Sequence, residues 1–481
     1  MKKVIFTLAT IVGSLSLFAQ KDKSHPNVII ILMDDMGYGD TEPYGMTGIA
    51  TPNFNKVAAE GTRFTHFNVG QPVCTASRAS LLTGTYPNRI GMAGVILPGA
   101  NRALNPKEKT LPAMLKETGY ETQMLGKWHL GNKPPYSPIH YGFDHFYGLP
   151  YSHDEWPVTW DSIRVTDPKD IRFNWPAVPV YNDDTVVDSI VTHERASKLT
   201  GELTQRAVAF INQKHTKPFF LYLAHPMPHA PLVPSERFKG KSGMGRFGDV
   251  IMELDWSLGE VLKALDQQGL TENTLLIVTS DNGPWLHFGD NAGSAGGFKE
   301  GKSTSFDGGT RVPFLVRWPG KVPAGYVNSS LITSMDVLPT IAAATGSALP
   351  TAQIDGLNFL PVWLGTEKAG PRKLYYYYYD GNTLRGIRYK NWKLVFAHNT
   401  QSYTGPHGRD GKPGKITHYD EPKGLYDLAH DPGERYNVLD VYPEVVKELE
   451  GYADEARKDL GDGLRNIPPT NVRAAAKVEN Q

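Results

Sequence analysis

The chain has 481 residues, and its 50 lysines and arginines balance 50 aspartates and glutamates, so the formal net charge is zero. This balance argues against nucleic acid as a partner held by bulk electrostatic attraction, and any anion recognition must come from a local pocket. A single cysteine excludes an internal disulfide, so stability must come from a packed core, which a chain of this length can build.

The N-terminus has the pattern of an export signal. Lys2 and Lys3 precede an apolar stretch over residues 4–18, and Ala19 provides a small-residue cleavage site. We therefore expect residues 1–20 to be removed and the mature protein to be periplasmic or secreted. No cysteine lies near the cleavage site to carry a lipid. No later stretch is apolar and long enough to predict a membrane span.

Over residues 21–365, short apolar runs typical of strands alternate with helical patterns. Strands are expected at 28–33, 121–125, 219–224 and 274–280, and helices at 52–60, 77–83, 111–118, 194–212 and 249–266. This alternation predicts an α/β catalytic domain in which helices sandwich a large, mostly parallel sheet. In such a domain the ligand site lies beyond the carboxyl ends of the strands.

The pattern changes after about residue 365. Strands expected at 375–379, 384–389 and 392–397 are joined by tight turns, and a helix is expected at 443–460. Residues 366–467 are therefore predicted to form a small antiparallel α+β subdomain. Residues 468–481 are expected to be a flexible tail.

The only cysteine, Cys74, needs a chemical explanation because a lone thiol in an exported protein has no disulfide partner. An isolated cysteine is usually a buried structural residue. Here it begins the run Cys74-Thr75-Ala76-Ser77-Arg78, which leads to Leu81-Leu82-Thr83-Gly84. These neighbours favour a catalytic role over the structural one.

Two pairs of polar residues directly follow predicted strands. Asp34 and Asp35 follow the strand at 28–33, and Asp281 and Asn282 follow the strand at 274–280. Either pair alone is more often a cap or a solvated loop. Together with the Cys74 run they favour a site for a hard cation, Ca²⁺ or Mg²⁺, which prefers oxygen donors.

From about residue 26 to residue 444 the chain resembles the type I, formylglycine-dependent sulfatases of the alkaline phosphatase superfamily, in the branch similar to arylsulfatase A. Besides the Cys74 run, the resemblance rests on Gly126-Lys127-Trp128-His129-Leu130-Gly131, Tyr151-Ser152-His153-Asp154, Pro228-His229-Ala230-Pro231, and Gly301-Lys302 with Asp307-Gly308-Gly309-Thr310-Arg311. The chain departs from the pattern at Ala76, where many members carry proline. It also departs at Asp307, where glutamate is more usual and a structural role is expected.

The resemblance implies that a maturation enzyme oxidises Cys74 to formylglycine, whose hydrate becomes the nucleophile. It also implies a site for Ca²⁺, with Mg²⁺ as the alternative. The implied metal ligands are Asp34, Asp35, Cys74 in its modified form, Asp281 and Asn282.

The remaining implied roles concern the sulfate ester. Arg78 would steady the hydrate and Asp281 would accept its proton, while Lys127, Lys302 and Ser152 would hold the sulfate group. His229 or His129 would protonate the departing alcohol, and His129 would serve as the base in the second step. The second hydroxyl of the hydrate then lets the sulfate leave by collapse to the aldehyde.

The resemblance implies hydrolysis of sulfate monoesters, and export favours a sulfated saccharide as substrate. Seven aromatic residues between Tyr141 and Trp160 offer faces for a sugar ring, although such residues are more often core anchors. The alternatives are a phosphonate monoester or phosphodiester hydrolase, a general arylsulfatase, and a glycan-binding protein with unmodified Cys74. The sugar, the position of its sulfate and the oligomeric state are not predicted.

Overall fold

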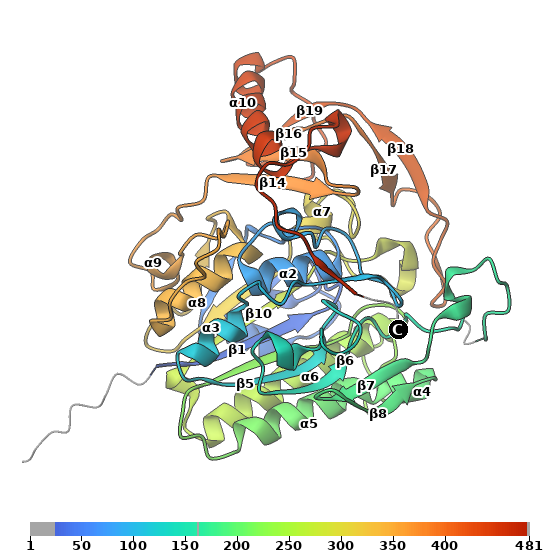
Figure 1. Ribbon diagram of the computed structural model, residues 1–481, viewed down its shortest axis with the longest axis vertical. Helices are drawn as coiled ribbons and strands as arrows, with labels where there is room; N and C mark the ends of the chain where they lie inside the picture. The colour runs from blue at the N-terminus through green and yellow to red at the C-terminus, as the bar shows by residue number, and fades with distance from the viewer. Residues whose placement is uncertain (1–24, 161–162, 479–481) are drawn as a thin grey trace, which may run out of the picture.

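The computed structural model describes residues 25–160 and 163–478, so the predicted export signal at 1–20 lies outside the described residues. Within that described part, a smaller domain, built from the chain after about residue 370, lies above a large domain (Figure 1). None of its helices has both the length and the apolar character that crossing a bilayer requires.

The large domain is organised around a ten-stranded sheet in the order β12-β2-β11-β10-β1-β9-β5-β6-β7-β8. The five neighbouring strands β10, β1, β9, β5 and β6 run parallel, and antiparallel pairs flank them. The bounds are β1 (Asn27–Met33), β2 (Thr62–Phe64), β5 (Glu121–Lys127), β6 (His145–Leu149), β7 (Val178–Asn182), β8 (Thr185–Ile190), β9 (Phe219–Ala224), β10 (Thr274–Ser280), β11 (Phe314–Arg317) and β12 (Tyr326–Asn328). This confirms the predicted mostly parallel α/β fold.

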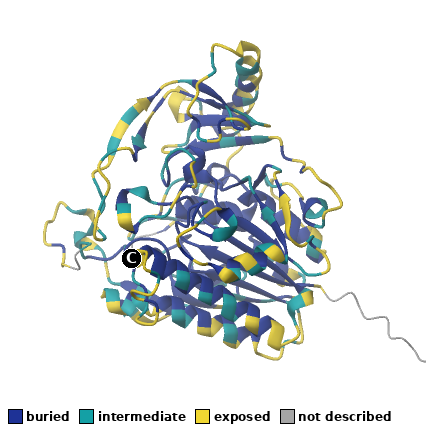
Figure 2. Ribbon diagram, turned by 180° about the vertical axis from the view of Figure 1, so that it is seen from behind, coloured by how far each residue is buried: buried dark blue, intermediate teal, exposed yellow. Residues whose placement is uncertain are grey.

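Helices cover both faces of the sheet, and exposed residues lie on their outer sides and in the connecting loops (Figures 1 and 2). The helices are α1 (Pro52–Ala59), α2 (Cys74–Thr83), α3 (Leu111–Glu117), α4 (His193–Ser197), α5 (Leu199–Ile211), α6 (Gly245–Gln267), α7 (Asp307–Thr310), α8 (Val337–Thr345) and α9 (Leu360–Trp363). Alternate residues of β1 enter opposite cores: Ile30 packs with residues of α2, α3 and α8, whereas Ile31 packs with residues of α1, α5 and α6. A strand buried on both faces explains why its sequence is continuously apolar.

Three expected helices differ from those observed. The helix expected over 249–266 begins four residues earlier, as α6. The helix predicted to start at Ser77 begins three residues earlier, so Cys74 is its first residue. The helix expected over 194–212 is divided at Lys198 into α4 and α5. By contrast, the predicted strands at 219–224 and 274–280 and the predicted helix at 443–460 have the observed bounds.

The smaller domain contains the antiparallel sheet β14-β15-β16-β19, with the long helix α10 packed on it. Its elements are β14 (Leu374–Tyr379), β15 (Thr383–Tyr389), β16 (Trp392–Val395), β17 (His398–Ser402), β18 (Thr417–Glu421), β19 (Gly424–Asp427) and α10 (Pro443–Leu460). Tyr375, Tyr377 and Tyr378 are buried in its core. The predicted antiparallel α+β subdomain is therefore present.

The flexible tail predicted from residue 468 is wrong for residues 468–478. Strand β20 (Ala476–Lys477) pairs with β4 (Arg102–Ala103) of the large domain. Arg473 donates both to Glu108 and, through its backbone N–H, to the Arg89 carbonyl. The sequence did not predict this packing because the tail has no long apolar run. Its partners are backbone groups and side-chain charges that are far away in sequence. Residues 479–481 lie outside the description.

Arg89 joins this segment to both domains, and we expect Arg89→Ala to lower the free energy of unfolding by about 3 kcal/mol. Its guanidinium is buried, lies 2.7 Å from Asp355 and 2.6 Å from Asp459, and donates to the Asn471 carbonyl. Alanine leaves the Asp355 carboxylate without its counter-charge. Urea unfolding measures the loss. Lys447→Ala on the exposed side of α10 is the control and should change stability by less than about 0.5 kcal/mol. An equal effect of both variants would contradict this account.

Candidate active site

The predicted site residues meet beyond the carboxyl ends of the central parallel strands. Strands β1 and β10 are paired in register, with Met33 opposite Ser280, so the polar pairs that follow them lie side by side. The backbone N–H of Asp35 donates to Asp281 Oδ1 at 3.1 Å, and that of Asp281 donates to the Met33 carbonyl at 3.1 Å. The register of two strands thus brings together residues that are 246 positions apart.

The oxygen donors predicted to bind a metal are all buried. Asn282 Nδ2 donates to Asp35 Oδ1 at 2.6 Å, whereas Asn282 Oδ1 is buried without a hydrogen-bond partner. Such an orphaned oxygen is rare in a folded protein. Ligand atoms of Asp34, Asp35, Cys74 and His229 lie within 4.8 Å of one another. The residues therefore fit a hard divalent cation, although the identity of the ion does not follow from them.

Cys74 begins α2 and points at this cluster. Its side chain is buried, and Sγ lies 3.3 Å from Asp34 Oδ1. Burial and the Asp34 charge raise the pKa of the thiol well above its usual range. The thiolate is the nucleophilic form of cysteine, and a raised pKa disfavours it.

Two cations on α2 and β5 offset the carboxylates. Arg78 donates through Nε to Asp281 at 2.9 Å and through Nη1 to the Lys127 carbonyl at 2.6 Å. Lys127 Nζ lies 2.5 Å from Asp34 Oδ2. Burial opposes ionisation of Asp34, but the charges of Lys127 and its neighbours prevail and hold the pKa of Asp34 well below its usual range. Burial and the Asp34 charge raise the pKa of Asp281 to about 6.

Lys302 completes the cationic set from a loop that is far away in sequence. Its Nζ lies 2.9 Å from the Asp35 carboxylate and 4.7 Å from the centroid of the Trp285 ring. The loop is held by a close backbone approach, since a Cβ at Gly308 would lie 2.0 Å from the Glu300 carbonyl oxygen. The Gly-Gly pair after Lys302 is thus required for packing. Asp307 has the structural role expected of it, because it is buried and accepts a hydrogen bond from Tyr377 of the C-terminal subdomain.

His129 and His229 both border the cluster. His129 Nε2 lies 2.9 Å from the Ile96 carbonyl, and its Nδ1 is buried without a partner. Burial and the nearby Lys127 and Arg78 charges lower the pKa of His129 well below its usual range. His229 Nδ1 lies 2.6 Å from the Ala230 carbonyl, and its Nε2 lies 3.5 Å from Asp35.

A cavity of about 350 Å³ opens over Cys74 and contains the predicted Ser152, His129, His229 and Lys302 in its lining. Ser152 Oγ is buried without a hydrogen-bond partner. The sequence analysis missed other residues of the wall: Val95, Leu97, Glu155, Ile171, Arg172, Trp175, Trp285 and Ser303. Glu155 follows the Tyr151–Asp154 segment directly, but Arg172 and Trp175 lie in a stretch without a recognisable pattern.

Most of the aromatic residues noted as possible sugar platforms belong to the core. Tyr141, Phe143, Phe146, Tyr147, Tyr151 and Trp156 are buried, and only Trp160 of that group lines the cavity. Trp160 packs edge-on against Trp285 and Phe288. The aromatic wall over the site therefore combines residues from segments that are distant in sequence.

The comparison with known proteins agrees with this geometry. The sulfatase family matches residues 26–347, and the C-terminal region of aryl-sulfatase matches residues 370–477. The chain belongs to the sulfatase family. Arylsulfatase A of Homo sapiens is 38% identical over 450 residues, which cover 88% of this chain and 86% of that protein.

Two further relatives span nearly the whole sulfatase. N-acetylgalactosamine-6-sulfatase of Mus musculus is 34% identical, covering 97% of this chain and 92% of that protein. The crystal structure of PsFucS1 sulfatase from Pseudoalteromonas sp. superposes with a TM-score of 0.80 at 28% identity, covering 93% of this chain and 92% of that one. The predicted relationship to arylsulfatase A is confirmed, and the enzyme is a hydrolase of sulfate esters.

Proposed function

We propose that this sulfatase acts on sulfated saccharides outside the cytoplasm through a formylglycine made from Cys74. The observation that carries the proposal is the setting of Cys74: a buried thiol lies among three aspartates, three cations and two histidines. Nucleophilic chemistry at this position requires another functional group, and oxidation to formylglycine supplies an aldehyde that hydrates to a geminal diol.

In the proposed first step, one hydroxyl of the diol loses its proton to Asp281 and attacks sulfur. The new oxygen–sulfur bond forms as the ester oxygen leaves with its electron pair, giving a sulfated hydrate and an alcohol. In the second step the remaining hydroxyl loses its proton, the aldehyde re-forms and sulfate departs. Addition of water to the aldehyde restores the diol.

We propose different roles for the two histidines on the basis of their hydrogen bonds and surroundings. A carbonyl oxygen only accepts, so His129 donates through Nε2 and its Nδ1 carries a lone pair inside a site that keeps the ring neutral. We assign His129 as the base for the second hydroxyl. His229 donates through Nδ1 to the Ala230 carbonyl, and its ring nitrogens lie 3.5 Å from Asp35 and 3.7 Å from Asp154. We assign His229 as the acid that protonates the leaving alcohol.

The cations stabilise the charge that moves during sulfuryl transfer. Lys127 and Lys302 lie on two sides of the aspartate cluster, and each can turn one N–H donor to a sulfuryl oxygen. Arg78 is fixed by Asp281 and by the Lys127 carbonyl, which positions it beside the hydrate. Asp34, Asp35, Asp281 and Asn282, with the modified Cys74, would hold Ca²⁺ or Mg²⁺. The bound ion would supply charge neutralisation for the nucleophile and the sulfate group.

A saccharide substrate is supported by the wall of the cavity and by the relatives. Trp160, Trp175 and Trp285 provide flat apolar faces, and Arg172 provides a donor at the same wall. One relative is named N-acetylgalactosamine-6-sulfatase, and a solved neighbour at 27% identity and a TM-score of 0.70 was determined in complex with k-i-k-neocarrahexaose. The export pattern at residues 1–20 supports a location outside the cytoplasm, which N-terminal sequencing of the protein from a periplasmic fraction would test.

The deciding experiment is sulfate release from saccharides sulfated at single known positions, with an aryl sulfate and an aryl phosphate alongside. The protein should be produced with a formylglycine-generating enzyme. We expect one sugar sulfate to be turned over faster than the other substrates. Faster turnover of the aryl phosphate than of every sulfate would instead favour the phosphoester alternative. Preference for the aryl sulfate alone would favour a general arylsulfatase.

Ser152→Ala should lower kcat/KM about 10- to 100-fold, because the buried Ser152 hydroxyl lines the cavity and can donate to the charged sulfate group. Steady-state kinetics on the preferred sulfate would measure the effect. Thr351→Ala, which removes an exposed hydroxyl outside both cavities, is the control and should leave kcat/KM unchanged. Equal kinetics for Ser152→Ala and the wild type would remove Ser152 from the substrate site.

A further inference from the structure

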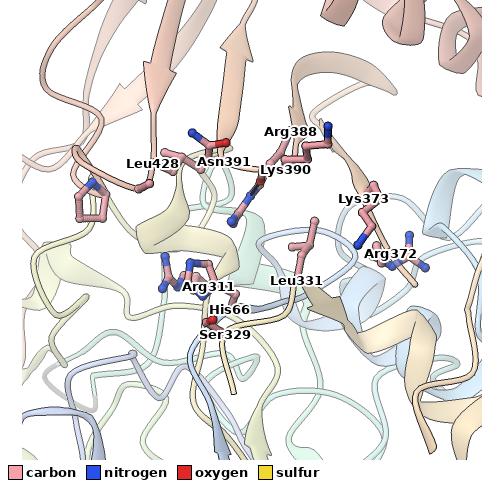
Figure 3. A pocket seen from close by; sticks show the side chains of 12 residues that line it. His66, Arg311, Ser329, Leu331, Arg372, Lys373, Arg388, Lys390, Asn391 and Leu428 are labelled. Atoms are coloured by element: carbon pink, nitrogen blue, oxygen red, sulfur yellow. Dashed lines mark hydrogen bonds between the residues drawn. The ribbon is translucent and has the colours of Figure 1, made fainter. Parts of the chain in front are cut away.

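A second cavity, of about 570 Å³, lies between the two domains (Figure 3). One wall belongs to the large domain and the facing wall to the C-terminal subdomain. The side chains involved are His66, Arg311, Ser329 and Leu331 on the first wall, Arg388, Lys390, Asn391 and Leu428 on the second, and Arg372 and Lys373 at one side. This interdomain basic pocket has no lining residue in common with the cavity over Cys74.

The charge of the pocket is one-sided. Five arginine and lysine side chains line it, and no carboxylate does within the described residues. Arg311 lies 3.5 Å from Asp307, and Arg372 lies 2.5 Å from Asp336, so two of the five have counter-charges behind the wall. For Lys373, Arg388 and Lys390, no carboxylate of the described chain lies within ion-pair distance. The pocket thus concentrates positive charge in a protein whose net charge is zero.

Arg388 also carries a hydrogen-bond donor that has no acceptor. Its side chain is 4% exposed, and Nε donates to the Lys390 carbonyl at 2.8 Å. Its Nη1 is buried and has no hydrogen-bond partner. A buried, charged donor without an acceptor is costly, and natural proteins rarely retain one unless a ligand or ion supplies the acceptor.

The shape and chemistry of the pocket indicate the class of ligand. Guanidinium groups present paired donors that match the oxygens of sulfate and phosphate groups. The volume lies in the range of pockets that hold organic ligands and exceeds what a bare ion needs. Leu331, Leu428 and Pro432 add apolar surface that can contact a sugar ring.

We propose that the interdomain basic pocket binds a sulfate-type oxyanion, either free or carried by a saccharide. The proposal goes beyond the proposed function because it concerns binding at a site without the catalytic groups. A sulfated chain held there would contact both domains. If the ligand is free sulfate, which is the product of the reaction, occupancy of the pocket would rise with the product concentration.

Binding should be measured by calorimetry in a Lys302→Ala background, which weakens sulfate binding at the active site. The ligands are sodium sulfate, a sulfated disaccharide and its unsulfated form, with sodium chloride holding ionic strength constant. We expect Arg388→Gln to weaken oxyanion binding at least about tenfold. The exposed pair Lys373→Gln and Lys390→Gln should act in the same direction. Lys107→Gln removes an exposed charge outside the pocket and should have no effect.

Binding of sodium sulfate that is sensitive to Arg388→Gln would identify the free anion as the ligand. Sensitive binding of the sulfated disaccharide alone would identify a saccharide-borne group. The proposal is overturned if neither ligand binds, if Arg388→Gln changes nothing, or if the unsulfated disaccharide binds equally well. Should Arg388→Gln fail to fold, the exposed lysine pair decides the question. Turnover by Arg388→Gln enzyme is a separate measurement, so failure of the proposed catalysis would not imitate failure of this site.

Discussion

Cys74→Ala is expected to lower sulfate ester turnover by about 10⁴-fold or more while the protein remains folded. The reason is that Cys74 is the only residue from which the nucleophile can be made, and the surrounding charges have nothing to activate without it. The thiol itself is small and buried, so alanine removes one atom from a site that Asp34, Lys127 and Arg78 already hold together. Sulfate release measures the activity, and thermal unfolding checks the fold.

Cys74→Ser provides the matched control for the mechanism. Serine keeps one hydroxyl at the same position but lacks the second hydroxyl through which the sulfated hydrate collapses. We expect it to form a stable sulfate ester on the enzyme, detected as the mass of one added sulfuryl group on the peptide that contains residue 74. Full activity of Cys74→Ala would contradict the formylglycine mechanism. Repeated turnover by Cys74→Ser would show that the second hydroxyl is unnecessary.

Asp281→Asn is expected to weaken metal binding and to lower turnover together, each by at least about 100-fold. The substitution removes a negative charge from the oxygen-donor cluster and also removes the carboxylate that Arg78 contacts at 2.8 Å. Metal content after dialysis and the rate of sulfate release are the two measurements. They should fall together because one carboxylate serves both the cation and the nucleophile.

The control for this prediction is Asp290→Asn, which makes the same chemical change at an exposed position shortly after the same strand. It should leave both metal content and turnover unchanged. Chelation of the wild-type enzyme should reproduce the loss, and added Ca²⁺ or Mg²⁺ should restore activity and show which ion the site prefers. Unchanged activity after removal of the metal would refute the assigned metal role.

Much of the fold follows from local sequence patterns. Strands at 219–224 and 274–280 are apolar runs bounded by polar residues, and both have the observed bounds. The helix at 443–460 starts at a proline and stops before Gly461, which are signals carried by neighbouring residues. The start of α2 was missed because Val73, which precedes Cys74, has no side-chain cap to mark the boundary.

The site residues with a recognisable neighbourhood were also found in advance. Cys74, Lys127, His229 and Lys302 stand in segments that resemble a family, and the structure brings them to one edge of the sheet. Residues whose role depends on a distant partner were missed. Arg172 lies in the short 3-10 helix Ile171–Asn174, which ends at Trp175, and only the packing of this segment beside Cys74 makes both residues part of the cavity.

The sequence by itself determined the alternation of strands and helices and the family, and it named the residues that we assign to the reaction centre, because each is encoded within a few neighbouring positions. Only the tertiary structure decided the rest. It placed residues 468–478 against the large domain, sent most of the expected aromatic platforms into the core and gathered arginines and lysines from both domains around one pocket. Each of these outcomes depends on contacts between residues that are far apart in the chain, and no local pattern records such contacts.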